Sequence, residues 1–481
     1  MGLISCIIKA NDRTGKTVFA SRDLLRSLRI EDARSIRLTL GSKSTDVIVK
    51  SFSTKGHSLR IPTSVARFLK LPFTGKCLLS RQENNEIRVG PLIGMLTASG
   101  SKDSSGRRGS EGIKQLMRAG KDRSFVFAFA KNDVDWGNET VIGSFPQPSG
   151  GWLRRKVPLP DVVYNRFLNR NEERSSSMDR FKRRLLGKGI PVFNWSFFDK
   201  GDVYKWLEGE SAYKYIPESI VSPSTKQIKQ LVEKYPFIYL KPTHGSAGRG
   251  IYRLAYVPKH GYYIRYRHGG KNVQIRYSRF DVMMNMIEKR SNMSRYVAQQ
   301  GVRLIELDGC SVDFRFHMIK NGNNEWVISG IGAKKAGRGS VTTHVRNGGK
   351  LIMPMRLLSG VFGSRAGKVL DNAKKTVIEL AEAVERKCPE TLGELGLDIG
   401  LDRRGNVWMF EANAKPGHTI FKHPSMKSAG RNSWAHLFEH CLYLSKFRGG
   451  RGNETGNRHP RMESKNTTSD KIRFERNGKI L

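Results

Sequence analysis

The segment that most constrains this chain is residues 395–417, LGLDIGLDRRGNVWMFEANAKPG, where acidic side chains interrupt two apolar runs. The runs lie on either side of Asp402–Gly405 and predict two neighbouring strands joined by a turn. Asp398 lies on the first strand, and Glu411 and Asn413, two residues apart on the second, share one face. A carboxylate among apolar neighbours is costly, so Asp398 and Glu411 require a cationic partner.

These three side chains offer the oxygen ligands that Mg²⁺ accepts while it keeps waters or borrows phosphate oxygens. The alternative interpretation is that Asp398 and Glu411 are merely exposed strand carboxylates. Their apolar surroundings favour the metal site, so we expect Mg²⁺ at Asp398, Glu411 and Asn413.

A glycine-rich loop lies earlier, in residues 236–251, PFIYLKPTHGSAGRGI. An apolar strand ends in Lys241, and the loop after it contains Gly245, Gly248 and Gly250, with Ser246 and Arg249 between them. Glycines allow backbone N–H groups to close on phosphate oxygens, and the serine and arginine add donors. The spacing is neither a Walker A motif nor a Rossmann turn. Taken alone, the segment is equally well explained as a hairpin turn.

Two further basic segments lie between these motifs. Asp313 and Arg315 occur in SVDFRFHM, followed by GIGAKKAGRGS at 330–340 and a turn, RNGG, at 346–349. Arg315 shares the strand face of Asp313, and by itself this pattern favours a structural ion pair.

The N-terminal residues 1–95 alternate short apolar runs with polar turns, which predicts a small β-rich domain. Expected strands cover 5–8, 35–40, 45–49 and 76–80, with one helix over 61–71 that places Val65, Phe68 and Leu69 on one face. Residues 96–123 are rich in Gly, Ser and Arg and predict an exposed connector with at most a short helix.

From residue 124 the pattern changes to strands alternating with helices, which predicts an α/β layer over 124–200. Strands are expected at 125–130, 161–166 and 191–195, and a basic helix near 180–186. Residues 368–387 have helical apolar spacing and predict a packing helix. The tail, 446–481, is basic, poor in apolar residues and expected to be disordered.

Charge and cysteine content narrow the function classes. Lys and Arg total 85 against 43 Asp and Glu, a net charge of +42. That excess predicts a polyanionic partner: ATP, nucleic acid, an anionic cell-wall polymer or a carboxylate-rich peptide. Clustered aromatics typical of a single-strand binder are missing, so nucleic acid is disfavoured. The five cysteines lack disulfide or zinc spacing, and no apolar stretch is long enough for a membrane span, so we expect a cytoplasmic protein.

In this order, the segments resemble the ATP-grasp superfamily and, more closely, the YheC/YheD endospore coat-associated family. The segments that carry the resemblance are VGPLIGMLT (89–97), PDVVYNR, FNWSFFDK ending at Lys200, YLKPTHGSAGRGI, YVAQQGV (296–302), VDFR and FEANAKPG. The resemblance implies an α+β multidomain chain in which the small β-rich domain (1–95), connector (96–123) and pre-ATP-grasp α/β segment (124–200) precede an ATP-grasp domain. That domain, 201–445, would consist of two α+β subdomains clasping ATP.

The resemblance also implies residue roles. Lys200 and Lys241 would contact the ATP phosphates, and residues 245–250 would close over them as a lid. Gln299 and Gln300 would hold the adenine at the hinge. Arg315 and Lys334 would be catalytic and reach the γ-phosphate or the transferred group, while Asp398, Glu411 and Asn413 carry Mg²⁺. Two positions depart from the family pattern: His344, where relatives commonly have Asn, and Gly396, where some peptide ligases have an anion-binding Arg.

Three functions remain open at this point. The first is an ATP-dependent carboxylate–amine ligase with unidentified carboxylate and amine substrates, which needs no protein nucleophile. The second is a catalytically silent nucleotide-binding protein that assembles the spore coat. The third is a polyanion-binding protein for which the ATP-grasp fold is only a scaffold. The intact lysines and metal ligands favour the first, with an anionic polymer or an acidic peptide as candidate partner.

Overall fold

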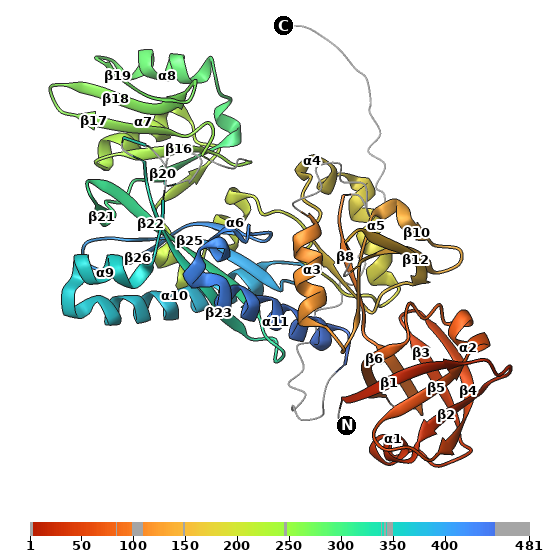
Figure 1. Cartoon of the computed structure of the whole chain (residues 1–481). Coiled ribbons are helices and arrows are strands. Elements are labelled where there is room, and N and C mark those ends of the chain that lie inside the picture. Colours follow the sequence, from red (N-terminus) through yellow and green to blue (C-terminus); the bar gives the residue numbers. More distant parts are fainter. Residues whose placement is uncertain are drawn as a thin grey trace, which may run out of the picture.

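The computed structural model describes residues 3–82, 84–98, 109–147, 150–244, 248–337, 339–340, 343 and 350–447 of the 481-residue chain. Its strands form a closed barrel followed by three sheets. Figure 1 shows the barrel and the next sheet on one side of the molecule and the other two sheets on the other side.

The N-terminal strands close into a barrel in the order β1-β5-β2-β4-β3-β7-β6. Alternating apolar residues point inward, as in β1, where Ile4, Cys6 and Ile8 are buried. The elements are β1 (Ile4–Asn11), β2 (Thr17–Ser21), α1 (Arg22–Leu28), β3 (Ser35–Leu40), β4 (Lys43–Phe52), β5 (Ser58–Pro62), α2 (Thr63–Phe68), β6 (Gly75–Arg81) and β7 (Glu86–Gly90). The expected helix over 61–71 is shorter, and Phe68 is 55% exposed, because so short a helix offers the barrel only one narrow face.

The second unit is a sheet in the order β10-β11-β9-β8-β13-β14, with β12 paired to β11. Its strands are β8 (Leu92–Leu96), β9 (Phe125–Phe129), β10 (Val134–Asp135), β11 (Thr140–Pro146), β12 (Trp152–Pro158), β13 (Val162–Asn165) and β14 (Val192–Phe193). Its helices are α3 (Gly109–Ala119), α4 (Arg170–Glu173) and α5 (Ser176–Gly187). The strand at 92–96 therefore belongs here, although we expected the N-terminal domain to reach 95. Every residue of this strand is buried, so its sequence does not alternate between apolar and polar residues. Without that alternation, the sequence does not show whether the strand belongs to the barrel or to the next sheet.

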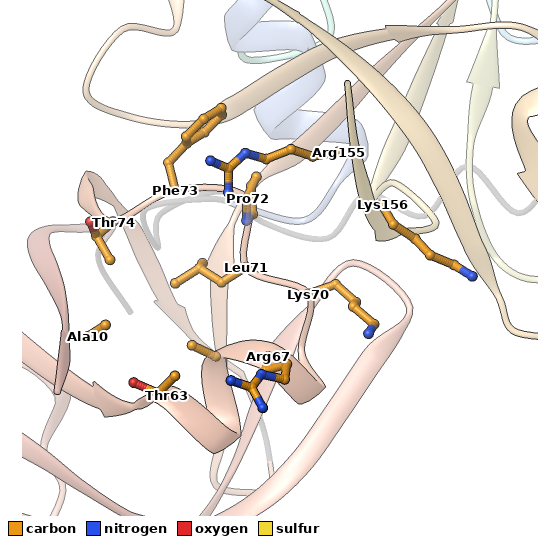
Figure 2. A pocket seen from close by; sticks show the side chains of 11 residues that line it. Ala10, Thr63, Arg67, Lys70, Leu71, Pro72, Phe73, Thr74, Arg155 and Lys156 are labelled. Carbon is orange, nitrogen blue, oxygen red and sulfur yellow. The ribbon is translucent and has the colours of Figure 1, made fainter. Parts of the chain in front are cut away.

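A cavity of about 600 Å³ lies where the barrel meets this unit (Figure 2). Arg67 and Lys70 line it from the end of α2, and Arg155 and Lys156 line it from β12. The Arg155 guanidinium lies 4.8 Å from the centre of the Phe73 ring. This basic cavity contains none of the candidate site residues.

The third unit is the β15–β20 sheet, in the order β15-β20-β16-β17-β18-β19. It consists of β15 (Ser219–Val221), β16 (Ile238–Pro242), β17 (Tyr252–Val257), β18 (Gly261–His268), β19 (Lys271–Tyr277) and β20 (Tyr296–Gln300). Helices α7 (Thr225–Lys234) and α8 (Phe280–Glu288) pack against one face, where Leu231, Leu254, Ile264 and Met283 form a buried core. The other face carries Lys241.

The fourth unit is the β21–β26 sheet, in the order β24-β23-β22-β25-β26, with β21 paired to β22. The strands are β21 (Glu306–Leu307), β22 (Cys310–Lys320), β23 (Trp326–Lys335), β24 (Lys350–Ile352), β25 (Glu394–Leu401) and β26 (Val407–Asn413). The helices are α6 (Lys200–Leu207), α9 (Pro354–Phe362), α10 (Ala366–Lys387) and α11 (Lys427–Leu444). As expected, α10 is a packing helix, with Ala373, Val377 and Leu380 buried.

The C-terminal helix α11 lies far along the chain but packs beside α3 on the second unit. Trp434 and Phe438 share a buried core with Ile113 and Leu116. The fold continues to Phe447, which is 1% exposed, so residues 446 and 447 belong to the fold and not to the expected tail. Residues 448–481 lie outside the described residues.

Candidate ATP site

The β21–β26 sheet places the catalytic and metal candidates on one face through its register. Arg315 on β22 lies opposite Gly332 on β23 and Asp398 on β25, and Asp398 lies opposite Glu411 on β26. A bulge follows at Phe410, because Ile399 pairs with Met409. Bulges of this kind re-aim side chains next to functional sites. The two strands joined by a turn are as the sequence predicts, and the register additionally places Asp398 opposite Glu411.

Arg315 and Lys334 both bind the Asp398 carboxylate. The Arg315 guanidinium donates to the two Asp398 oxygens at 2.8 and 2.7 Å. Lys334 Nζ lies 2.9 Å from Asp398 and 3.0 Å from Asp313, so it bridges the two carboxylates. Burial opposes ionisation of Asp398, but the charges of Arg315 and Lys334 outweigh it and hold the pKa of Asp398 well below its usual range. Both cations are thereby fixed in orientation.

Lys241 extends from β16 toward this group from the other sheet. Its ammonium donates to Gln299 Oε1 at 2.6 Å. Burial, together with the charge of Lys200, lowers the pKa of Lys241 to about 8. The carboxylates of Glu411, Asp313 and Asp398 oppose this lowering of the pKa, but burial and the charge of Lys200 outweigh them.

Lys200 stands at the start of α6, where Asp199 caps the helix. Its ammonium lies 3.4 Å from Glu411 Oε1. The site thus brings together four cations and three carboxylates from two sheets and one helix: Lys200, Lys241, Arg315 and Lys334, with Asp313, Asp398 and Glu411. These seven side chains therefore have a net formal charge of +1 before any ligand is added.

Gln299, expected at the adenine, contacts Lys241. Its side chain is fully buried, and its amide donates to Tyr204 Oη and Ser219 Oγ at 2.9 Å each while its oxygen accepts from Lys241. Both amide N–H groups and the oxygen are thus engaged, so Gln299 orients Lys241, and its contact with an adenine stays a prediction. Gln300 Oε1 accepts from the backbone N–H of Glu218 at 3.0 Å.

The glycine-rich lid is only partly described. Gly245 and Ser246 lie outside the described residues, as does His344. Gly248 and Gly250 have φ values of 70° and 69°, and a Cβ on Gly250 would approach Pro242 and Tyr296 to 3.0 Å. Arg249, between them, is exposed. The turn therefore requires glycine at 250.

Gly396 pairs with Asn413, the third metal candidate. A Cβ on Gly396 would meet Pro416 at 2.7 Å and Arg315 Nη1 at 3.1 Å. Arg315, from the neighbouring strand, fills the space above this position. No other side chain fits there, which explains the departure noted in the sequence.

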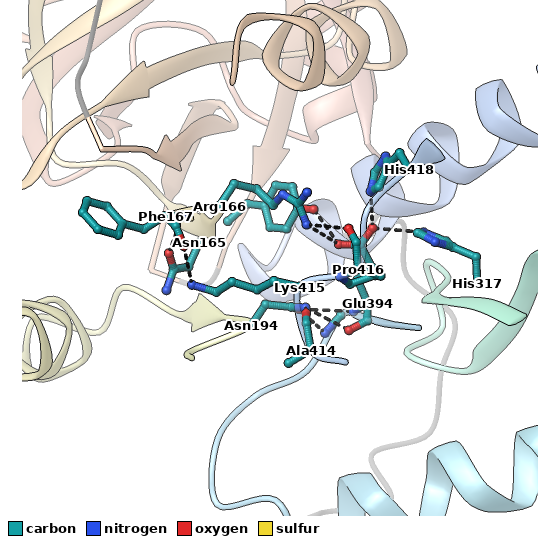
Figure 3. Close-up of polar contacts among 12 residues, drawn as sticks. Asn165, Arg166, Phe167, Asn194, His317, Glu394, Ala414, Lys415, Pro416 and His418 are labelled. Atoms are coloured by element: carbon teal, nitrogen blue, oxygen red, sulfur yellow. Dashed lines mark hydrogen bonds and ion pairs between the residues drawn. The ribbon is translucent and has the colours of Figure 1, made fainter. Parts of the chain in front are cut away.

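A buried polar junction was missed by the sequence reasoning (Figure 3). Glu394, four residues before Asp398, accepts from Tyr164 at 2.7 Å, and Arg166 lies at 3.3 Å. Its other oxygen contacts His418 and lies 3.0 Å from His317 Nε2. The ligand atoms of His317, Glu394 and His418 lie within 4.8 Å of one another, close enough for a metal. Arg166 already neutralises the carboxylate, so we interpret the cluster as a joint between β13 and β25.

A second buried joint involves Lys415, in the same motif as Glu411. Lys415 Nζ donates to Glu173 at 2.8 Å and to the Phe167 carbonyl at 3.1 Å. Lys182 contacts the same Glu173 oxygen at 3.0 Å. Burial lowers the pKa of Lys415 to about 7. A Lys directly after a metal-ligand motif is a sequence signal that could have pointed to this contact.

Comparison with known proteins identifies the fold of the ATP site. A family model described as YheC/D like ATP-grasp matches residues 189–444. The chain belongs to the YheC/D ATP-grasp family. The endospore coat-associated protein YheD of Bacillus subtilis (strain 168) is 32% identical over 383 residues, which cover 76% of this chain and 81% of YheD. YheC of the same organism is 25% identical over 281 residues, which cover 56% of this chain and 74% of YheC.

Solved structures similar to this family member include D-alanyl-alanine synthetase A from Vibrio cholerae. It is 13% identical with a TM-score of 0.45, and the match covers 74% of this chain and 97% of that one. The ATP-grasp ligase PsnB, complexed with the precursor peptide PsnA2 and AMPPNP, is 15% identical with a TM-score of 0.41, over 74% and 99% of the two chains. Among the described residues, no helix is both long and apolar enough to cross a membrane.

Proposed function

We propose that this protein is an ATP-dependent carboxylate–amine ligase. In this reaction a substrate carboxylate attacks the γ-phosphorus of ATP, ADP leaves, and an amine then displaces phosphate from the acyl phosphate. The observation that carries the proposal is the convergence of Lys200, Lys241, Arg315 and Lys334 on one site with a net positive charge. A polyphosphate would supply the negative charge that balances these cations.

The lysines and the arginine would act on different parts of ATP. Lys241, on the β15–β20 sheet, and Lys200, at the start of α6, would bind the phosphates. Arg315 and Lys334 are already fixed by carboxylates at 2.7–3.0 Å. They would stabilise the charge that spreads over the transferred phosphoryl group without first being reoriented.

Asp398, Glu411 and Asn413 would hold Mg²⁺. The donor set fits this ion, because it consists of carboxylate and amide oxygens on paired strands, and the side chains of Asp398 and Glu411 are 13% and 29% exposed. The ion would draw charge away from the phosphate oxygens during transfer. Glu411 would exchange its contact with Lys200 for the metal.

The substrate carboxylate can act as nucleophile without help from a cysteine. Each of the five thiols is free, and four are buried. Burial raises the pKa of Cys6 to about 12 and that of Cys388 to about 11, so neither is a thiolate near neutral pH. This agrees with direct attack by the substrate on ATP. The names of YheC and YheD favour a spore-coat setting for the reaction.

The test is Mg-dependent release of ADP, screened against amino acids, cell-wall peptides and acidic peptides. Glu411→Gln keeps the shape of the side chain but removes the charge, so we expect turnover to fall at least roughly tenfold. Glu382→Gln, an exposed position on α10, is the matched control and should behave as the wild type.

Calorimetry of Mg-ATP binding separates the remaining outcomes. Binding without turnover of any substrate pair would support the catalytically silent assembly protein instead. Wild-type turnover by Glu411→Gln, or no Mg-ATP binding by the wild type, would refute the ligase.

A further inference from the structure

A long acid-free segment covers most of the β15–β20 sheet. Between Glu233 and Asp281 the chain contains ten Lys or Arg residues and no Asp or Glu. The cations at its two ends have acidic partners, since Lys234 lies 2.6 Å from Glu218 and Arg279 lies 2.6 Å from Asp281. The strands between them, β17, β18 and β19, supply no negative charge of their own.

The cations of these strands share one face. Alternate residues of β17 and β18 pack against α7 and α8 in the buried core, including Leu254, Tyr262 and Ile264. The intervening residues point away from both helices. Four of them are arginines, and we name this surface the arginine face: Arg253 on β17, Arg265 and Arg267 on β18, and Arg276 on β19.

Two of these arginines lie directly opposite each other. The register pairs Tyr239 with Arg253, Arg253 with Arg265, and Arg265 with Gln274, in one row across four strands. Like charges opposite each other on paired strands are destabilising. Burial lowers the pKa of Arg253, and the charges of Arg265 and Arg303 add to the effect.

Neutral groups hold these guanidinium groups in place without cancelling their charge. Arg253 lies 4.1 Å from the centre of the Phe237 ring. Arg265 donates to Gln274 Oε1, with its Nε at 3.0 Å, and Arg276 donates to the backbone carbonyl of His260 at 2.6 Å. The row is therefore oriented but not neutralised, which is the arrangement of a site for an anion.

We propose that the arginine face binds an acidic polypeptide, an extended segment rich in Asp and Glu. The planar fork of arginine matches a carboxylate in a bidentate geometry. Among the strands that the structure describes, β19 is an edge of its sheet, and a sheet edge can take an extended chain as a further strand. A nucleic acid would use stacking platforms, and Tyr263 is the one aromatic residue on this face of β18.

The position of the face connects it to the ATP site. Tyr239, at the end of the arginine row, precedes Lys241 by two residues on β16 and shares its face. A peptide on the row would thus extend toward the phosphate-binding lysine. The inference rests on the proposed function to this extent: the bound carboxylates would be the class of group that the ligase phosphorylates.

The experiment measures binding of a fluorescein-labelled poly-glutamate peptide to the full chain by fluorescence anisotropy, without ATP. Arg253→Gln/Arg265→Gln should weaken binding at least roughly tenfold and reduce its dependence on salt. Lys226→Gln/Lys229→Gln removes the same charge from exposed positions of α7, on the opposite side of the sheet, and should bind as the wild type does. Equal loss in both variants would overturn the proposal.

Two further measurements keep the result interpretable. Hydrogen exchange on the wild type should show peptide-dependent protection of β18 and β19, and protection elsewhere would refute the site even if the arginine variant folds poorly. An oligothymidylate or polyphosphate of equal charge should bind more weakly than the poly-glutamate peptide. Equal affinity would mean that the arginine face recognises phosphate groups instead of carboxylates. Mg-ATP affinity should be unchanged in the arginine variant, so failure of the ligase and failure of this site are distinguishable.

Discussion

Replacing Lys241 with Met should change stability and ATP binding in opposite directions at neutral pH. Burial and Lys200 lower the pKa of Lys241 from 10.5 to about 8. That difference corresponds to roughly 3 kcal/mol by which the fold disfavours the charged lysine. Met has a similar length and no charge, so the variant escapes this cost. It leaves Gln299 Oε1 without its donor, which costs about 1–3 kcal/mol at every pH.

The pH dependence isolates the charge from the lost hydrogen bond. The unfolded chain binds the Lys241 proton more tightly than the folded one, so this lysine makes the wild type gain stability as pH rises from about 8 to 10.5. Lys241→Met lacks that gain. The difference in free energy of unfolding between the two proteins should therefore shift by about 3 kcal/mol toward the wild type between pH 7 and 10.5.

Urea unfolding at several pH values checks this, with Lys229→Met at an exposed position of α7 as control. At pH 7, calorimetry should show at least roughly tenfold weaker Mg-ATP binding by Lys241→Met, or about 1.4 kcal/mol. A difference in stability that stays flat with pH would show that the ammonium is not desolvated. Wild-type ATP affinity would remove Lys241 from the phosphate site.

Three other predictions concern the buried framework. Burial lowers the pKa of His440 to about 3. Between pH 7 and 4.5, the free energy of unfolding of the wild type in urea should therefore fall by about 2.5 kcal/mol more than that of His440→Phe. An equal fall in both proteins would contradict this. Phe447→Ala should cost about 3 kcal/mol, whereas truncation after Phe447 should leave the melting temperature near that of the wild type. Asn194→Ala should lower the free energy of unfolding in urea by about 2–3 kcal/mol. The reason is that Asn194 accepts from the Gly393 N–H and donates to the Glu394 carbonyl, at 2.8 Å each. An unchanged free energy would mean that water replaces the side chain.

The ATP-site strands could be predicted because their signal is local. Asp398 and Glu411 stand in apolar runs separated by a short turn, and that pattern predicts the hairpin, while the two-residue spacing of Glu411 and Asn413 predicts their shared face. Their partners could not be predicted in the same way. Arg315 was read first as a partner of Asp313, two residues away, but it binds Asp398 across the sheet. Strand order and register determine that contact, and neither can be inferred from the residue spacing within one segment.

The N-terminal unit shows a second limit. Alternation located β1, β3, β4 and β6, but the barrel also depends on parallel pairs such as β1 with β5 and β2 with β4. Parallel partners are distant in sequence, so local patterns do not reveal that the strands close. The strand at 92–96 was misplaced for a related reason, since it is buried throughout.

The same two strands that build the ATP site also attach the second unit of the chain to it. On β25, Asp398 binds Arg315 and Lys334, whereas Glu394 contacts Tyr164 and Arg166. Just after β26, Lys415 is fixed by Glu173 in a fully buried pair.

Breaking a buried ion pair is costly because it leaves an uncompensated buried charge. We therefore treat the second unit and the β21–β26 sheet as one rigid base, joined by these contacts. The β15–β20 sheet is connected differently. Tyr204 bridges it to the base through two neutral hydrogen bonds, to Gln299 at 2.9 Å and to the Phe410 carbonyl at 2.8 Å. His244 also contacts Asp199 at the start of α6, and Val297 packs in the core of the base. Neutral bonds exchange with water at little net cost. We therefore expect that any displacement within the site would move Lys241 and the arginine face together, relative to Asp398, Glu411 and Arg315.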